Sequence, residues 1–159
     1  MLTKVTMKTI NQWFDEYATS HQHKTNQKIH FFCVPAIFFS IIGMLMSIPT
    51  SLITNFTNIS NPFLENWATP VLILLFIFYI RLSFSIFVRM LTFSIICLVS
   101  NYYLSTLAPL FYTSLTIFII AWIGQFYGHK LEGKKPSFFK DLQFLLIGPA
   151  WVFEKLSRK

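Results

Sequence analysis

Charged residues are scarce in this chain. Only 12% of its 159 residues are Asp, Glu, Lys or Arg, whereas 54% are hydrophobic. An ordinary soluble domain has about twice that share of charge, and a disordered chain combines low hydrophobicity with high charge. The composition therefore excludes a disordered protein and argues against a soluble one. It predicts an integral membrane protein, and the length suits a single domain over residues 1–159.

Acidic residues are the scarcer of the two charge signs. Six Asp and Glu stand against 13 Lys and Arg, which gives a net charge of +7. In a soluble protein such an excess would suggest a nucleic-acid partner. In a membrane protein it indicates basic flanks on the cytoplasmic side, so we expect contact with membrane lipid and no nucleic-acid partner.

Cysteines are few, and the common catalytic motifs are absent. Cys33 and Cys97 lie in apolar runs and form neither a CxxC pair nor a zinc-binding spacing, so we expect both to be apolar core residues. The chain has no GxSxG, P-loop, GxGxxG or CxxCH motif, which argues against the hydrolases, nucleotide-binding proteins and c-type cytochromes that these motifs mark. The first 28 residues are polar, so we expect no cleavable signal peptide.

Four apolar segments are candidates for crossing a bilayer. The first, residues 29–48, would extend over about 30 Å as a helix. A second run, from 67 to 107, is too long for one span, and Arg81-Leu82-Ser83 divides it. We therefore predict four spanning helices, over residues 29–48, 68–80, 84–104 and 110–127.

The basic residues indicate which ends of these spans face the cytoplasm. All 13 lie in residues 1–28, at Arg81 and Arg89 on either side of the turn between the second and third spans, or after the fourth span; the loops 49–66 and 105–109 contain none. This one-sided distribution follows the positive-inside rule. It predicts an all-α, integral membrane four-helix bundle with residues 1–28 and 128–159 in the cytoplasm, in a bacterial inner membrane or the endoplasmic reticulum.

Each cytoplasmic end contains a short apolar or amphipathic segment. Within residues 5–20, Ile10, Trp13, Phe14 and Tyr17 form one stripe, which predicts an amphipathic helix at the membrane interface. A second short apolar helix is expected over residues 138–145. Gly148-Pro149 is expected to break it before a terminal turn that contains Trp151.

The histidines gather at one predicted depth. The chain has only four, His21, His23, His30 and His129, and the predicted topology places all of them at cytoplasmic ends of spans. Because that topology rests on lysines and arginines alone, the coincidence is an independent signal. Imidazole binds iron, zinc, copper and nickel. Membrane di-iron enzymes use more histidines than four, so we expect a single ion.

Spacing adds polar neighbours to two of these histidines. Asn26 precedes His30 by one helical turn and is a candidate N-cap of the first span. Gln125, His129 and Glu132 follow one another by four and three residues, so they would share a helix face. A carboxylate such as Glu132 can bind a metal or accept a hydrogen bond from a ligand histidine. The plainer interpretation, that these are capping, solvated or ion-paired interface residues, stays open at this point.

Two stretches at the ends of the chain follow recognisable patterns. Residues 17–35 fit YxxxHxxxxNxxxH…VP, beginning at Tyr17 and ending at Pro35. Residues 122–154 fit WxxQFxGHxxEGxxP followed by GP…E. Together these stretches resemble the 2-hydroxy fatty acid dioxygenase family. The residues between 50 and 110 resemble it only in being apolar.

The resemblance implies an iron(II)-dependent enzyme of lipid α-oxidation, which uses O₂ to shorten a long-chain 2-hydroxy fatty acid by one carbon. It implies Fe(II) as the cofactor, with metal ligands His21, His30 and His129. His23 is the expected fourth ligand, although relatives often have asparagine there. The expected catalytic residues are Asn26, Gln125 and Glu132. We expect the substrate carboxylate to be attracted by Lys24, Lys28 and Lys130.

Two alternatives from other classes stay open. His30 and His129 could bind a b-type haem between helices of a bundle, as in membrane electron carriers. The chain could instead be a non-catalytic lipid-binding membrane protein. The absorption spectrum and the metal content of the purified protein would distinguish the three interpretations.

Overall fold

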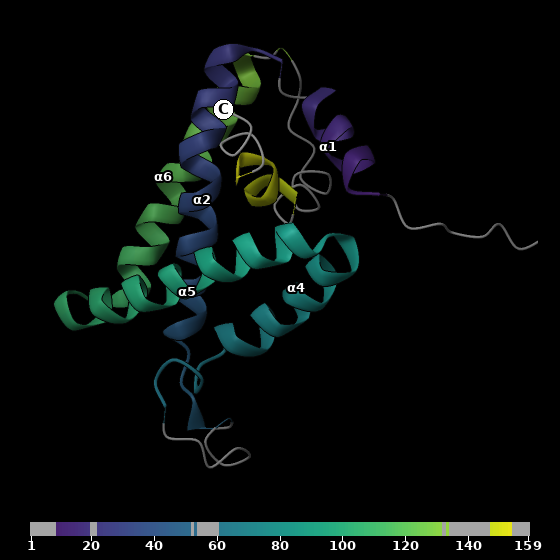
Figure 1. Cartoon of the computed structure of the whole chain (residues 1–159). Coiled ribbons are helices and arrows are strands. Elements are labelled where there is room, and N and C mark those ends of the chain that lie inside the picture. Colours follow the sequence, from purple (N-terminus) through teal and green to yellow (C-terminus); the bar gives the residue numbers. More distant parts are fainter. Residues whose placement is uncertain are drawn as a thin grey trace, which may run out of the picture.

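The computed structural model describes residues 9–19, 22–51, 53, 61–131, 133 and 147–153. All regular secondary structure in these ranges is helical, which confirms the all-α class (Figure 1). The helices are α1 (Ile10–Thr19), α2 (Lys24–Met46), α4 (Ala68–Leu82), α5 (Phe84–Leu107) and α6 (Leu110–Leu131). Residues 147–153 form a further helical stretch, called here the C-terminal segment. The predicted helix over residues 138–145 lies outside the described residues.

Three helices are long and apolar enough to cross a membrane. These are α2, α5 and α6, with 23, 24 and 22 residues. The apolar α4 has 15 residues, about 22 Å of helix, whereas the hydrocarbon layer is about 30 Å thick. Large apolar side chains lie on outer surfaces, such as Phe32 (80% exposed) and Leu107 (83% exposed), and such a surface suits lipid. That residues 68–80 cross the membrane, and which ends of the helices face the cytoplasm, stay predictions.

The helices extend beyond the predicted spans. α2 begins at Lys24 rather than at residue 29, α5 ends at Leu107 rather than at 104, and α6 ends at Leu131 rather than at 127. The predicted bounds followed the apolar runs, which mark the hydrocarbon layer. Helical hydrogen bonds can continue into the polar interface, where Lys and Gln are good helix formers. The predicted division at Arg81-Leu82-Ser83 is confirmed, because α4 ends at Leu82.

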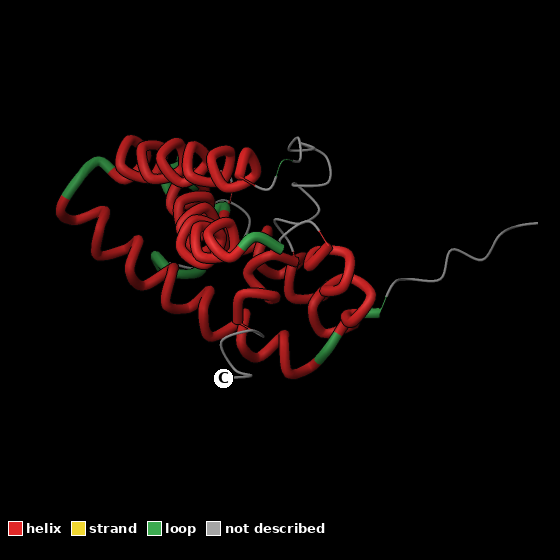
Figure 2. Tube along the Cα trace, turned by 90° about the horizontal axis from the view of Figure 1, so that it is seen from above, coloured by secondary structure: helices red, strands yellow, loops and turns green. Residues whose placement is uncertain are grey.

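Helices α2 and α6 form an antiparallel pair, and α4 and α5 form a hairpin that crosses it. α2 and α6 lie side by side in opposite directions, and α5 lies across α2 (Figure 1). In the view turned by 90°, α2 is seen nearly end-on while α5 extends across the picture (Figure 2). Ser83 joins α4 to α5 in an extended conformation (φ −167°, ψ 128°). The expected four-helix bundle is therefore not confirmed.

Two glycines let α2 and α6 approach closely near the start of α2. Gly124 and Gly128 form a GxxxG pair in α6, the spacing that brings small residues to one helix face in membrane proteins. A Cβ atom added at Gly124 would lie 2.7 Å from the Sγ atom of Cys33, and one added at Gly128 would overlap Oδ1 of Asn26. The backbone of α6 is therefore in direct contact with α2 side chains.

A third glycine brings three helices together near the other end of the pair. A Cβ atom at Gly43 of α2 would overlap the side chains of Asn101 from α5 and Ser114 from α6. Asn101 is fully buried and donates hydrogen bonds to the carbonyl oxygens of Phe39 (3.1 Å) and Cys97 (2.9 Å). Asn101 therefore lies inside α5, and its amide satisfies backbone acceptors within the protein.

The C-terminal segment is buried among the other helices. Residues 147–152 are buried, and the Trp151 ring lies 6.2 Å from the Phe31 ring of α2. Phe153 contacts Phe93 of α5, with ring centres 4.8 Å apart. Phe14 of α1 packs against the cluster of Trp151 and Val152. The segment therefore connects α1, α2 and α5 (Figure 1).

The two terminal elements differ in how well they were predicted. α1 falls within the predicted residues 5–20, and Thr9 and Gln12 exchange hydrogen bonds of the capping-box type at its start. Its location at a membrane interface stays a prediction. The predicted break at Gly148-Pro149 is wrong, since residues 147–153 are helical.

Candidate functional site

Two buried histidines meet between α2 and α6. His30, in α2, and His129, in α6, are 3% and 7% exposed. Their ring centres are 5.1 Å apart and the ring planes are nearly perpendicular, at 88°. The antiparallel packing of α2 on α6 brings these residues together from opposite ends of the sequence. Their predicted proximity is therefore observed.

A buried carboxamide lies one turn before each of these histidines. Asn26 precedes His30 in α2 and is fully buried, and Gln125 precedes His129 in α6 and is 5% exposed. The Oδ1 atom of Asn26 lies against the backbone of α6 at Gly128. Two imidazoles and the Asn26 carboxamide thus lie at the contact of α2 with α6, and the buried Gln125 carboxamide lies one turn before His129. Such a polar cluster needs internal partners or a ligand, because burying a polar group without a hydrogen bond is costly.

The remaining histidines do not add to this pair among the described residues. His23 is exposed and is the N-cap of α2, where its Nδ1 atom accepts a hydrogen bond from the Thr25 N–H (3.2 Å). The prediction that Asn26 caps this helix is therefore wrong. His21 and Glu132 lie outside the described residues. Within the ranges that are described, no three His, Cys, Asp or Glu side chains gather as a metal site would require.

The His30–His129 distance is compatible with two imidazoles on one ion. With a metal–nitrogen bond of about 2.1 Å and a ring nitrogen about 1.1 Å from its ring centre, ligand angles of about 90–110° place two ring centres roughly 4.5–5.2 Å apart. The observed 5.1 Å falls in this range. The donor set, imidazole with carboxamide oxygen, suits a borderline metal such as iron or zinc.

The same distance does not favour a haem between these histidines. Axial imidazoles lie on opposite faces of the macrocycle, so for the same bond length their centres are about 6.4 Å apart. At 5.1 Å, with one ring edge toward the other ring face, His30 and His129 leave no gap for a porphyrin. The geometry therefore argues against the bis-histidine electron carrier.

Exposed lysines surround this end of the helix pair. Lys24 and Lys28 lie in the first turns of α2, and Lys130 lies in the last turn of α6; all three are exposed. They leave a positive surface beside a buried polar cluster, which can raise the local concentration of an anionic ligand. Their predicted role toward a carboxylate stays a prediction.

The family of the chain follows from a sequence match that includes all of these residues. A family model described as 2-hydroxy-palmitic acid dioxygenase Mpo1-like matches residues 7–159. The chain belongs to the Mpo1-like family. This confirms the resemblance seen in the two terminal motifs. No curated protein and no solved structure matches the chain.

Sequence reasoning missed two features that shape the site of this Mpo1-like chain. The first is the GxxxG pair Gly124 and Gly128. In an apolar helix this spacing indicates close packing against another helix, so the sequence did contain a signal for it. The second is the packing of Trp151 against Phe31, the neighbour of His30. No local pattern indicated it, because the glycine and proline before Trp151 suggested a break.

Proposed function

We propose that the chain is an iron(II)-dependent dioxygenase that shortens long-chain 2-hydroxy fatty acids by one carbon. The observation that carries the proposal is the buried pair of imidazoles, His30 and His129, 5.1 Å apart between two apolar helices. The family description, which names a 2-hydroxy-palmitic acid dioxygenase, supports the substrate class. Metal binding and O₂ use are parts of this proposal.

In this proposal His30 and His129 hold the ion, and His21 and His23 complete the set of histidine ligands. Iron(II), when bound, supplies the redox chemistry with O₂ that amino-acid side chains lack. His23 uses Nδ1 in the helix cap, so Nε2 is its remaining ring nitrogen for a metal. Glu132 is proposed to accept a hydrogen bond from a ligand histidine or to bind the ion itself.

The carboxamides of Asn26 and Gln125 are proposed to orient the substrate head group. Each amide offers two N–H donors and a carbonyl acceptor, which suit a carboxylate and a neighbouring hydroxyl group. Both side chains are buried, and a hydrogen bond is stronger where water is excluded. The lysines at the rim attract the carboxylate, while the acyl chain remains among apolar side chains and stays out of water.

The proposed reaction balances with one molecule of O₂. A 2-hydroxy acid, RCH(OH)COOH, and O₂ give RCOOH, CO₂ and H₂O. The bond between the first and second carbons breaks, and O₂ accepts the four electrons lost by the substrate. No separate organic cofactor is needed for this balance.

The proposal is tested on protein purified in detergent and loaded anaerobically with iron(II). With O₂ and 2-hydroxypalmitic acid, we expect a 15-carbon acid, detected by mass spectrometry, with oxygen from labelled O₂ in its carboxylate. Palmitic acid should react poorly because it lacks the hydroxyl group, and zinc should not replace iron because it has no redox chemistry. Iron-loaded protein that leaves 2-hydroxy acids of several lengths unchanged would refute the enzyme and favour a non-catalytic lipid-binding protein.

Variants connect this activity to the site. His30→Ala and His129→Ala should each lower bound iron, measured by elemental analysis, and lower product formation with it. His23→Ala should lower bound iron less, because His23 is exposed at the helix cap. Full iron content in His129→Ala would remove α6 from the metal site.

A further inference from the structure

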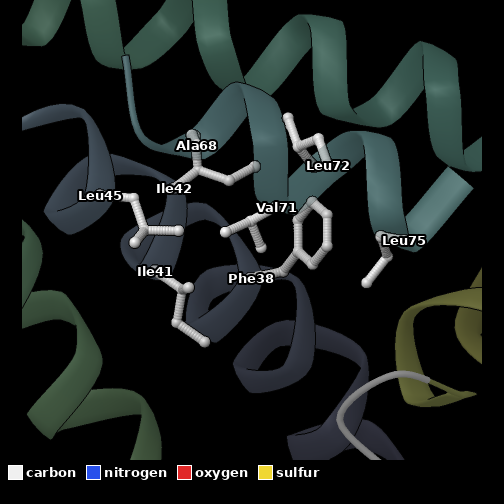
Figure 3. Close-up of a pocket in the computed structure, with 8 residues that line it drawn as sticks. All are labelled: Phe38, Ile41, Ile42, Leu45, Ala68, Val71, Leu72 and Leu75. Atoms are coloured by element: carbon white, nitrogen blue, oxygen red, sulfur yellow. The ribbon is translucent and has the colours of Figure 1, made fainter. Parts of the chain in front are cut away.

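An apolar cavity lies between α2 and α4. Its volume is about 120 Å³, and eight hydrocarbon side chains line it, four from each helix (Figure 3). The α2 side includes Phe38, Ile42 and Leu45, and the α4 side includes Ala68 and Leu72. None of these side chains can hold a water molecule by hydrogen bonds. A dry protein cavity of about 150 Å³ admits benzene, so this one can admit a hydrocarbon segment of similar size.

The cavity lies on the same stripe of α2 as the candidate metal ligand. From His30, the residues that follow at steps of four, four, three and four are Val34, Phe38, Ile41 and Leu45. These steps keep residues on one face of a helix. Phe38, Ile41 and Leu45 line the cavity, so one continuous helix face leads from the buried histidines to the cavity.

The distance along this face matches the length of a long acyl chain. Ile41 and Leu45, which lie on this face and line the cavity, are eleven and fifteen residues beyond His30, about 16.5 and 22.5 Å at the helical rise of about 1.5 Å per residue. In a staggered chain with carbon–carbon bonds of about 1.5 Å, each methylene advances roughly 1.3 Å. The 14 bonds from the hydroxyl carbon of 2-hydroxypalmitic acid to its methyl carbon therefore cover about 18 Å. A head group at the histidines would place the methyl end between the levels of Ile41 and Leu45, at the cavity.

Phe38, the lining residue nearest to His30 along α2, is held in place by aromatic packing. The Phe38 ring stacks on Phe93 of α5 at 5.3 Å, and Phe93 contacts Phe153 of the C-terminal segment at 4.8 Å. Ala68, at the start of α4, is fully buried and has the smallest side chain of the cavity lining. A larger side chain at position 68 would fill part of the cavity.

We propose that this cavity binds the terminal methyl segment of the acyl chain and sets the preferred chain length, a proposal that rests on the proposed function. Ala68→Leu should fill the cavity and lower kcat/KM for 2-hydroxypalmitic acid relative to the 12-carbon acid. Burying one methylene changes affinity roughly fourfold, so excluding two should shift this ratio about 15-fold. Leu72→Ala should enlarge the cavity and shift the preference toward 18 carbons or more.

A matched control comes from the same helix. Leu74 is 70% exposed, whereas Leu72 is buried in the cavity wall. Leu74→Ala makes the same chemical change on the outer face and should leave the chain-length profile unchanged. An active enzyme whose profile is unchanged by both Ala68→Leu and Leu72→Ala would overturn the proposal.

A second measurement does not depend on turnover. A 16-carbon 2-hydroxy acid with a photoreactive diazirine at its terminal carbon should crosslink to the cavity-lining residues of α2 and α4, in competition with unlabelled 2-hydroxypalmitic acid. Such labelling in an inactive protein would support the cavity while refuting the dioxygenase. Labelling spread over exposed positions such as Leu74, or without competition by the unlabelled acid, would mean that ordinary membrane lipid fills the cavity, and would overturn the proposal.

Discussion

Replacing Gly128 with alanine tests how α6 supports the site. An alanine Cβ at this position would overlap Oδ1 of Asn26, whose side chain has no exposed area. The carboxamide would have to move away from α6 while the rest of α2 packs around it. We expect Gly128→Ala to destabilise the protein only while Asn26 is present, because the overlap involves that side chain.

Two opposing effects set the size of the change. Alanine stabilises a helix interior by about 0.5–1 kcal/mol relative to glycine, and overpacking a close contact costs about 1–3 kcal/mol. The native background should therefore lose up to about 2.5 kcal/mol. In an Asn26→Ala background the overlap is absent, so the same change should stabilise by about 0.5–1 kcal/mol. The difference, about 1–3 kcal/mol, is the coupling between the two positions.

The measurement is the free energy of unfolding of four proteins in detergent micelles, followed by circular dichroism: native, each single variant and the double variant. Gly124→Ala is the control, because its Cβ would meet Sγ of Cys33 at 2.7 Å and not Asn26. Its effect should be the same with and without Asn26. If Gly128→Ala changes stability equally in both backgrounds, the Asn26 side chain does not lie over Gly128 and the described site is wrong.

Three further results are expected. Gly43→Ala should lower the unfolding free energy by up to about 2.5 kcal/mol, because its Cβ overlaps α5 and α6 side chains. Bound iron should not change, and a loss of iron would link this crossing to the site. Trp151→Ala should cost about 3–5 kcal/mol, and Trp151→Phe should cost less; an unchanged melting temperature would contradict burial of the C-terminal segment. In a cysteine-free background, Asn61→Cys and Lys24→Cys should react with impermeant thiol reagents from opposite sides of the membrane; labelling from one side would refute the topology.

The sequence predicts the helices better than their packing. Apolar runs and the Arg81-Leu82-Ser83 break locate the long helices to within about five residues, because hydrocarbon thickness sets the length of an apolar segment. The crossing of α5 over α2 could not be predicted. In a membrane, the outer face of a helix is as apolar as its packed face, so hydrophobic periodicity does not reveal the partner. The contact at Gly43 depends on which small and polar side chains meet, and no spacing shows this.

The candidate site was partly predictable because depth in the membrane constrains distance. Basic residues placed His30 and His129 at one level, and the structure brings them to 5.1 Å. Whether the two side chains meet depends on which faces of α2 and α6 pack together. The α6 glycines lie at that contact, and the charge pattern gives no information about it. His23 shows the limit of the same reasoning, because a histidine directly before a helix can cap it instead of pointing inward. The roles of His21 and Glu132 stay predictions.

The contact between His30 and His129 has a consequence for how the protein is made. Their positions in the sequence differ by 99 residues, about 5–20 s of synthesis at about 5–20 residues per second. In the predicted topology, α2 lies in the bilayer without α6 throughout that interval, and the C-terminal segment is synthesised later still. Asn26 and His30 lie in the first two turns of α2, at its predicted cytoplasmic end, where water and lipid head groups can solvate them. A bilayer-facing polar pair would be far costlier at mid-membrane, so a site assembled last is best built at the ends of its helices.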